Sequence, residues 1–179
     1  MKIRMNRAVV VGLTLAAVTG CSSVTTSMSG YAGQETRGIK SLSENDIAAY
    51  LEGKGQGFAK PAELNGYPGP MHVLELGDRL ALTPEQQLAT TALLKEHKQE
   101  VRTLGREYIA SEQTLERLFA SKSATPETLK LAVDESARLQ SRIRAAHLET
   151  HLKQTALLTP EQVASYQRLR GYQGGDHAH

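Results

Sequence analysis

The amino-acid sequence predicts an all-α protein built on a long antiparallel helical hairpin with short flanking helices. Residues 84 to about 121 and 126 to about 157 carry apolar side chains at helical spacing, and each segment begins at a Thr-Pro pair. Only the short turn of residues 121–125 separates them, so the two helices should run side by side in opposite directions. Since the 179 residues include no Trp and two Phe, a thin core is expected.

The N-terminus has the features of a secretory signal peptide. Lys2, Arg4 and Arg7 give it a positive start, residues 8–17 are uncharged and mostly apolar, and small residues precede Cys21. The apolar run is too short to span a bilayer. The ending VTGC is similar to a bacterial lipobox, which implies that residues 1–20 are removed and that Cys21 is lipidated. The alternative is an ordinary cleaved signal followed by an incidental cysteine.

Removal of this segment changes the charge balance of the chain. Three of the 21 Lys and Arg residues precede Cys21, so 18 remain against 19 Asp and Glu. A nearly neutral mature chain gives no support for nucleic-acid binding. Because Cys21 is the only cysteine, its lipidation leaves no thiol for a disulfide, a redox motif or a thiolate metal site.

Two further segments precede the long helices. Residues 21–42 are rich in Ser, Thr and Gly and are expected to form a flexible tether. Residues 43–70 should hold a short helix and a Gly/Pro-rich connector, with Ser43 as N-cap, Asp46 near the positive end of the helix dipole and Gly53 at the end. The Gly-rich run 53–57 lacks the strand and the Lys-Ser/Thr of a phosphate loop.

The remaining helices should form one domain, residues 71–172, followed by a disordered tail, residues 173–179. Pro70 is expected in the first turn of a helix that carries apolar residues from Met71 to Leu80. Residues 82–86 and 158–162 are both LTPEQ, in which Thr caps a helix, Pro takes the first position and Gln reaches back to the cap. The motif residues are Leu82, Thr83, Gln86, Leu158, Thr159 and Gln162.

The first long helix has an almost heptad apolar stripe, which His97 and Ser111 interrupt. Two helices alone leave such a stripe uncovered, so dimerisation or client binding should cover it. His97 breaks an apolar position and is expected to be solvated or at an interface. The predicted client or dimer surface comprises Leu94, Val101, Leu104, Tyr108, Leu115 and Leu118.

The two LTPEQ motifs in a signal-bearing helical chain resemble the Spy/CpxP family of periplasmic stress proteins, named for its LTxxQ motif, and the related CnrX-type heavy-metal sensors. The resemblance covers roughly residues 71–172. It implies a four-helix hairpin that dimerises into a cradle. Spy-like members bind unfolding clients without ATP, CpxP-like members restrain a sensor kinase, and CnrX-like members bind a transition metal through His, Glu and Met.

A candidate metal site lies near the end of the second long helix. His147 and His151 are four residues apart, so both imidazoles lie on one face of the helix. In an antiparallel hairpin this end approaches the Met71 helix, where His72, Glu75 and Met71 are candidate further ligands for Zn, Ni, Co or Cu. The alternative is that these histidines make ordinary hydrogen bonds to neighbouring residues.

No pattern of nucleophile and base suggests catalysis, and the chain is expected not to be an enzyme. Glutamates 96, 100, 107, 112 and 116 are interpreted as solvated helix faces. The leading hypothesis is a periplasm-facing lipoprotein on the outer rather than the inner membrane, with a transition metal as the one candidate cofactor. As a homodimer it would bind unfolded envelope proteins or a membrane sensor protein. The alternatives are a heavy-metal sensor or resistance protein and a structural spacer.

Overall fold

The computed structural model describes residues 29–172 of the chain. The predicted signal peptide, Cys21 and the C-terminal tail lie outside these residues. Residues 33–172 belong to one compact unit. Within the described residues every regular element is a helix, and none of these helices is both long enough and apolar enough to cross a membrane.

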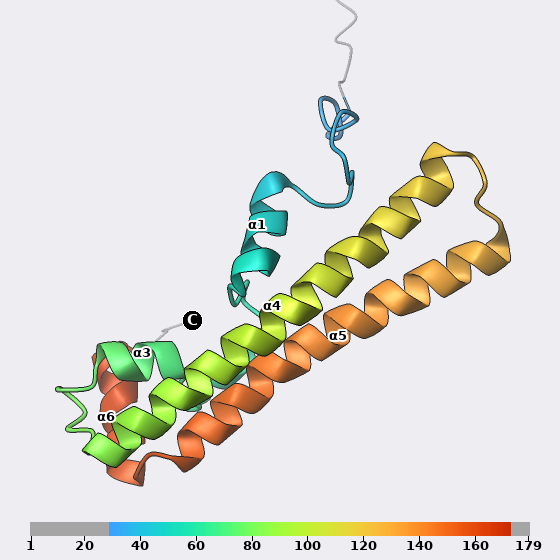
Figure 1. The fold of residues 1–179 in the computed structure, drawn as a ribbon. Helices are drawn as coiled ribbons and strands as arrows, with labels where there is room; N and C mark the ends of the chain where they lie inside the picture. The colour runs from blue at the N-terminus through green and yellow to red at the C-terminus, as the bar shows by residue number, and fades with distance from the viewer. Residues whose placement is uncertain (1–28, 173–179) are drawn as a thin grey trace, which may run out of the picture. The chain divides into compact units, whose positions relative to one another are not determined.

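Two long helices form the predicted hairpin. Helices α4 (Pro84–Ala120) and α5 (Pro126–Ala156) run side by side in opposite directions, joined by residues 121–125 (Figure 1). Each begins with a capping box, in which the side chain of Thr83 or Thr125 accepts from the backbone three residues on. The hairpin and its boundaries are therefore confirmed.

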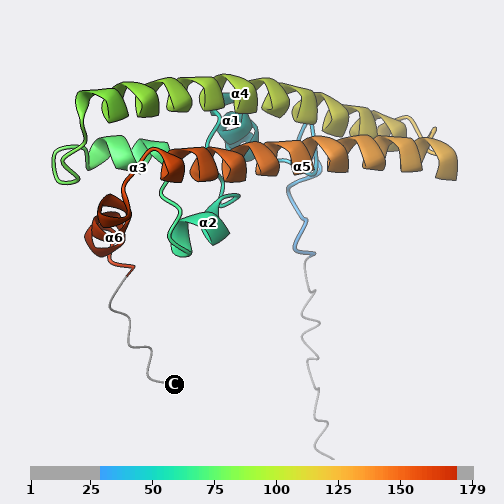
Figure 2. The ribbon, with the colours of Figure 1, turned by 90° about the horizontal axis from the view of Figure 1, so that it is seen from below.

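The N-terminal helix α1 (Glu44–Glu52) packs across the middle of α4, as Figure 2 shows. Ser43 and Asp46 form its capping box, and Gly53 ends it in the left-handed conformation, as the sequence predicts. The backbones of α1 and α4 approach closely at Gly105, where an added Cβ would lie 2.5 Å from the carbonyl oxygen of Tyr50. Only glycine permits this contact.

The main core lies between α1, α4 and α5. Val101, Leu104 and Tyr108 are each at most 7% exposed, so the prediction that they line an open client or dimer surface is wrong. Tyr50 from α1, and Ile39 and Leu42 before it, cover them from one side, while Leu139 and Ile143 of α5 cover them from the other. This middle part of the expected surface is interior because the segment before α4 folds back over it.

The segment before α1 also differs from the predicted tether at its end. Ile39 and Leu42 are buried, the Lys40 ammonium lies 2.5 Å from Glu116, and the Ser41 hydroxyl donates to Glu112 at 2.6 Å. Glu112 also accepts from Ser136 and is 7% exposed. The interpretation of Glu112 as part of a solvated face is therefore wrong, because hydroxyl groups from the segment before α1 and from α5 both donate to its carboxylate.

Three short helices lie at the open end of the hairpin: α2 (Lys60–Leu64), α3 (Pro70–Glu75) and α6 (Pro160–Leu169). A second apolar cluster of Val73, Leu80, Leu82 and Tyr166 joins α3 and α6. Helix α3 ends earlier than expected, and Leu80 reaches this cluster from the turn that follows. Helix α2 lies inside the predicted connector and was not expected from the sequence.

Candidate functional site

A cavity of about 640 Å³ lies where the connector, α3, α4 and α5 meet. Four of the six histidines in the sequence line it. Glycines 53, 55 and 57 border it, together with Met71 and Glu63. The four histidines come from three helices, namely His72 from α3, His97 from α4, and His147 and His151 from α5.

Three of these imidazoles are held through Nδ1. The Nδ1 of His151 lies 2.7 Å from the carbonyl oxygen of Tyr67, and that of His72 lies 2.8 Å from Glu75. The Nδ1 of His97 lies 3.0 Å from the Thr150 hydroxyl.

Each of these contacts places the proton on Nδ1. A carbonyl and a carboxylate accept only, and the Thr150 hydroxyl donates its own proton to Ala146 at 2.8 Å, so it accepts from His97. With Nδ1 protonated, the neutral form of each of these three rings carries its lone pair on Nε2. Metal-binding histidines are characteristically oriented by a partner on the other ring nitrogen in this way.

The fourth imidazole, His147, is the most deeply buried of the set at 5% exposure. It stacks on Phe58 with ring centroids 5.7 Å apart and meets the edge of His97 at 4.6 Å. Its Nε2 is buried without a hydrogen-bond partner. Such atoms are rare in folded proteins and point to a missing ligand, water or ion.

Burial keeps His97 and His147 uncharged near neutral pH. Desolvation lowers the pKa of His97 to about 4, and the nearby His151 and Lys98 act in the same direction. Desolvation also lowers the pKa of His147 to about 4, with His97 and His151 adding to the effect. Neutral imidazoles are the form that binds metals.

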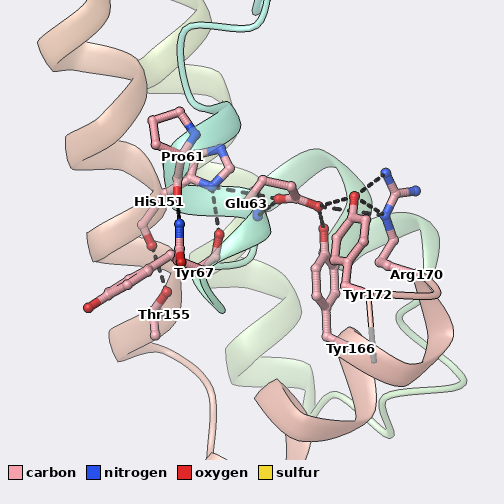
Figure 3. Close-up of polar contacts among 10 residues, drawn as sticks. Pro61, Glu63, Tyr67, His151, Thr155, Tyr166, Arg170 and Tyr172 are labelled. Carbon is pink, nitrogen blue, oxygen red and sulfur yellow. Dashed lines mark hydrogen bonds and ion pairs between the residues drawn. The ribbon is translucent and has the colours of Figure 1, made fainter. Parts of the chain in front are cut away.

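Glu63, which the sequence analysis missed, lies at the edge of this cavity (Figure 3). Its Oε1 accepts from the Tyr166 hydroxyl at 2.5 Å and from the Tyr172 hydroxyl at 3.1 Å. The Arg170 guanidinium is 3.6 Å away. Burial, and then Glu63 itself, raise the pKa of Tyr166. Glu63 thereby joins α2 to the C-terminal segment.

The other carboxylate oxygen of Glu63 faces the histidines. Its Oε2 accepts from the Gly69 backbone N–H at 3.2 Å and lies 3.7 Å from Nδ1 of His151. Gly69 itself packs against His151, because an added Cβ would lie 2.9 Å from Cε1 of that ring. The turn before α3 is therefore shaped around His151.

Comparison with known proteins identifies the family of this chain. The sequence matches the model of the heavy-metal resistance family over residues 48–165, well over half of the chain. The chain belongs to the heavy-metal resistance family. This family is part of the Spy/CpxP-like all-α periplasmic fold group, so the resemblance holds at the level of the fold group. Neither the curated proteins nor the solved structures contain a match to the chain.

The structure brings together most of the predicted ligands of this heavy-metal resistance protein. His147, His151 and His72 line one cavity, as expected. Glu75 does not line it but binds His72 from behind. His97 was expected to be solvated or at an interface, and this is wrong, since it is 8% exposed and contacts His147 inside the protein.

The donor set fits a transition metal in chemistry, since it offers four imidazoles and the thioether of Met71. Across residues 29–172, however, no group of three or more His, Cys, Asp or Glu side chains is already arranged around one point that could hold an ion. Side-chain rotation within the cavity is therefore required for more than two of these residues to bind the same ion.

Proposed function

We propose that this chain binds a transition metal ion in the histidine cavity, within a periplasmic metal-resistance response. The observation that carries the proposal is the shared state of His72, His97 and His151, whose Nδ1 atoms are bonded and whose Nε2 atoms are free. Imidazole suits Zn²⁺, Cu²⁺, Ni²⁺ and Co²⁺, whereas Mg²⁺ and Ca²⁺ prefer oxygen. The family match supports the same class of ligand.

Closure of the site is expected to involve the loop of residues 53–57. This loop borders the cavity and leads directly into Phe58, whose ring stacks on His147. Its three glycines, two of them with positive φ, give the backbone freedom to adjust. Movement of Phe58 would release the His147 ring to rotate toward an ion.

Titration calorimetry of the mature protein with each of the four ions tests this proposal. We expect binding much tighter than millimolar, weakened about tenfold or more by His147→Ala with His151→Ala. The matched control is His177→Ala with His179→Ala, which removes the two histidines at the C-terminal end of the sequence. Equal losses in both variants, or no binding at all, would contradict the site.

A second function, binding of unfolded proteins or of a membrane sensor partner, is favoured by the distal end of the hairpin. Phe119, Leu131 and Val133 are 45–71% exposed there, and Leu115 and Leu118 are half-buried. These two are the members of the predicted client surface that lie beyond the region covered by α1. Leu94 lines the histidine cavity instead.

Aggregation of a denatured client without ATP is the test of that second function. The wild-type protein should suppress light scattering, and Phe119→Glu with Leu131→Glu should abolish the effect. Lys130→Glu is the matched control on the same surface. Suppression that survives the apolar substitutions would contradict client binding at the distal surface. Separately, light scattering of the protein alone over a series of concentrations tests the expected homodimer.

The proposed location is the periplasmic side of the outer membrane, through a lipid on Cys21. The VTGC sequence supports it, and the fold group is periplasmic. Metabolic labelling with a radioactive fatty acid should mark the wild-type protein and not Cys21→Ser. Labelling of both proteins, or of neither, would contradict a lipid on Cys21. No catalytic role is proposed.

A further inference from the structure

Glu63 contacts two parts of the molecule that are far apart in the sequence. One carboxylate oxygen accepts from Tyr166 and Tyr172, and the other accepts from Gly69 and lies 3.7 Å from His151. Figure 3 shows the carboxylate between these two groups. The Glu63 side chain is only 14% exposed, so its interactions are weakly screened by solvent.

Few other interactions hold α6 against the hairpin. The helix has ten residues, and its fully buried side chain is Tyr166 in the small cluster with Val73, Leu80 and Leu82. Leu169 and Tyr172 pack against this cluster while remaining partly exposed. At its start, the Gln162 amide bonds Gln86 and the Leu80 carbonyl. At the end of α6, Glu63 accepts hydrogen bonds from the hydroxyls of Tyr166 and Tyr172 and attracts the Arg170 guanidinium. The polar part of the docking of this end therefore depends on the charge of Glu63.

The same carboxylate supports the backbone that orients His151. Glu63 holds the Gly69 N–H at 3.2 Å, and Tyr67, two residues earlier, accepts from Nδ1 of His151 at 2.7 Å. Loss of the Gly69 contact would loosen the turn that fixes the His151 ring. Glu63 is thus a neighbour of the cavity that acts through His151.

We propose that Glu63 is a positioning residue that couples metal binding at His151 to the docking of α6. The inference rests on the proposed metal site. An imidazole that binds a cation through Nε2 becomes a stronger donor at Nδ1, and the added positive charge favours the nearby carboxylate. A more firmly fixed carboxylate holds Tyr166, Tyr172 and Arg170 more tightly. Because coupling is reciprocal, an undocked α6 weakens metal binding by the same factor.

The consequence is that the docking of α6, at the open end of the hairpin, changes with metal occupancy of the cavity. Its two arrangements are docked, as in this structure, and released from Glu63. The partner that reads this difference would contact α6 rather than the cavity.

Hydrogen exchange of the full mature chain, measured with and without saturating Zn²⁺, tests the coupling. In the wild-type protein Zn²⁺ should slow exchange of the amides of residues 164–170 by about fivefold or more. Glu63→Gln and Tyr166→Phe should each remove most of this slowing. Both should also weaken Zn²⁺ binding, by about tenfold for Glu63→Gln. Tyr166→Phe keeps the buried ring, so it tests the link even where Glu63→Gln fails to fold.

Glu75→Gln is the matched control, because Glu75 supports His72 in the same cavity through a carboxylate contact. It should weaken Zn²⁺ binding yet keep the slowing in α6 at saturation. Failure of the wild-type protein to bind Zn²⁺ or the other three ions overturns the metal site itself. Binding without slowing in α6 overturns the coupling alone. Equal slowing in Glu63→Gln and wild type also overturns it, since a purely structural Glu63 would change both states alike.

Discussion

The side-chain amides of Gln86 and Gln162 bind each other. Nε2 of Gln86 lies 2.8 Å from Oε1 of Gln162, and Nε2 of Gln162 lies 2.9 Å from Oε1 of Gln86. Each oxygen also accepts from the N-cap of its own helix, and each nitrogen also donates to a backbone carbonyl beside the other motif. The repeated LTPEQ sequence therefore joins the starts of α4 and α6 as well as capping them.

This pairing predicts that Gln86→Ala and Gln162→Ala are not independent. Each should lower the free energy of unfolding by about 1–3 kcal/mol, because a cap is lost and a half-buried amide loses its partner. The double variant should lose at least about 0.5 kcal/mol less than the sum. Urea denaturation measures all three.

The third capping box supplies the control for the pairing. Thr128 caps α5 with Thr125 but has no counterpart on another helix. Thr128→Ala should therefore cost only about 1 kcal/mol and add to either glutamine variant. Simple additivity of Gln86→Ala and Gln162→Ala would show that the amide pair contributes nothing.

Gly105 is predicted to resist a substitution that helices normally favour. Alanine is the better helix former by about 1 kcal/mol, but here its Cβ would lie 2.5 Å from the Tyr50 carbonyl oxygen. Gly105→Ala should therefore lower stability by about 1–3 kcal/mol, because α1 must move away. Gly55→Ala, where no atom lies within 4 Å, should leave the thermal midpoint nearly unchanged. A stabilising Gly105→Ala would mean that α1 does not pack there.

The burial of Ile39 predicts that the end of the supposed tether is structural. Ile39 is 4% exposed within the main core, so Ile39→Ala should cost about 2–4 kcal/mol in urea denaturation. Leu51→Ala provides the comparison. Because Leu51 is 45% exposed on α1, this substitution should lower the free energy of unfolding far less. If both variants behave alike, residues 39–42 do not join the core.

The buried histidines predict acid sensitivity of the metal-free protein. The pKa of His97 and of His147 is about 4 in the folded protein and about 6.5 in the unfolded chain. The unfolded chain thus binds more protons between these values, so stability is full above pH 6.5 and falls as the pH drops toward 4. Each histidine accounts for up to about 3 kcal/mol.

The groups around these two rings do not offset their protonation. His97 and His147 face each other, with His151 and Lys98 nearby, while the Phe58 ring stacks on His147 and the Thr150 hydroxyl contacts His97. His97→Gln with His147→Gln should therefore flatten the fall in urea midpoint between pH 6.5 and 4. An unchanged slope in that variant would assign the acid sensitivity to other groups.

Local signals in the sequence were sufficient for most of the fold. Ser43, Thr83, Thr125 and Thr159 cap the helices at the predicted positions, because a capping box depends only on residues three apart. The apolar stripe of α4 was also identified correctly. What covers it was not, since Ile39 and Tyr50 reach Val101 and Leu104 through contacts distant in the sequence.

The cavity was predicted only in part for the same reason. The spacing of His147 and His151 placed them on one face, and the antiparallel turn brought His72 near. His97 could have been included among the cavity residues from the sequence. It interrupts the apolar stripe of α4, and in an antiparallel hairpin that part of α4 lies opposite the end of α5. Glu63 could not, because it lies on a five-residue helix with no side-chain cap and its partners Tyr166 and Tyr172 are on the far end of the chain.

The most direct test of the metal site is the nitrogen NMR spectrum of the imidazoles during titration with Zn²⁺. Without metal, His72, His97 and His151 should each show the tautomer protonated at Nδ1. On addition of Zn²⁺ the Nε2 resonances of cavity histidines should shift in proportion to occupancy, while their Nδ1 protons remain. Shifts confined to His177 and His179, or none at one equivalent of Zn²⁺, would contradict the account.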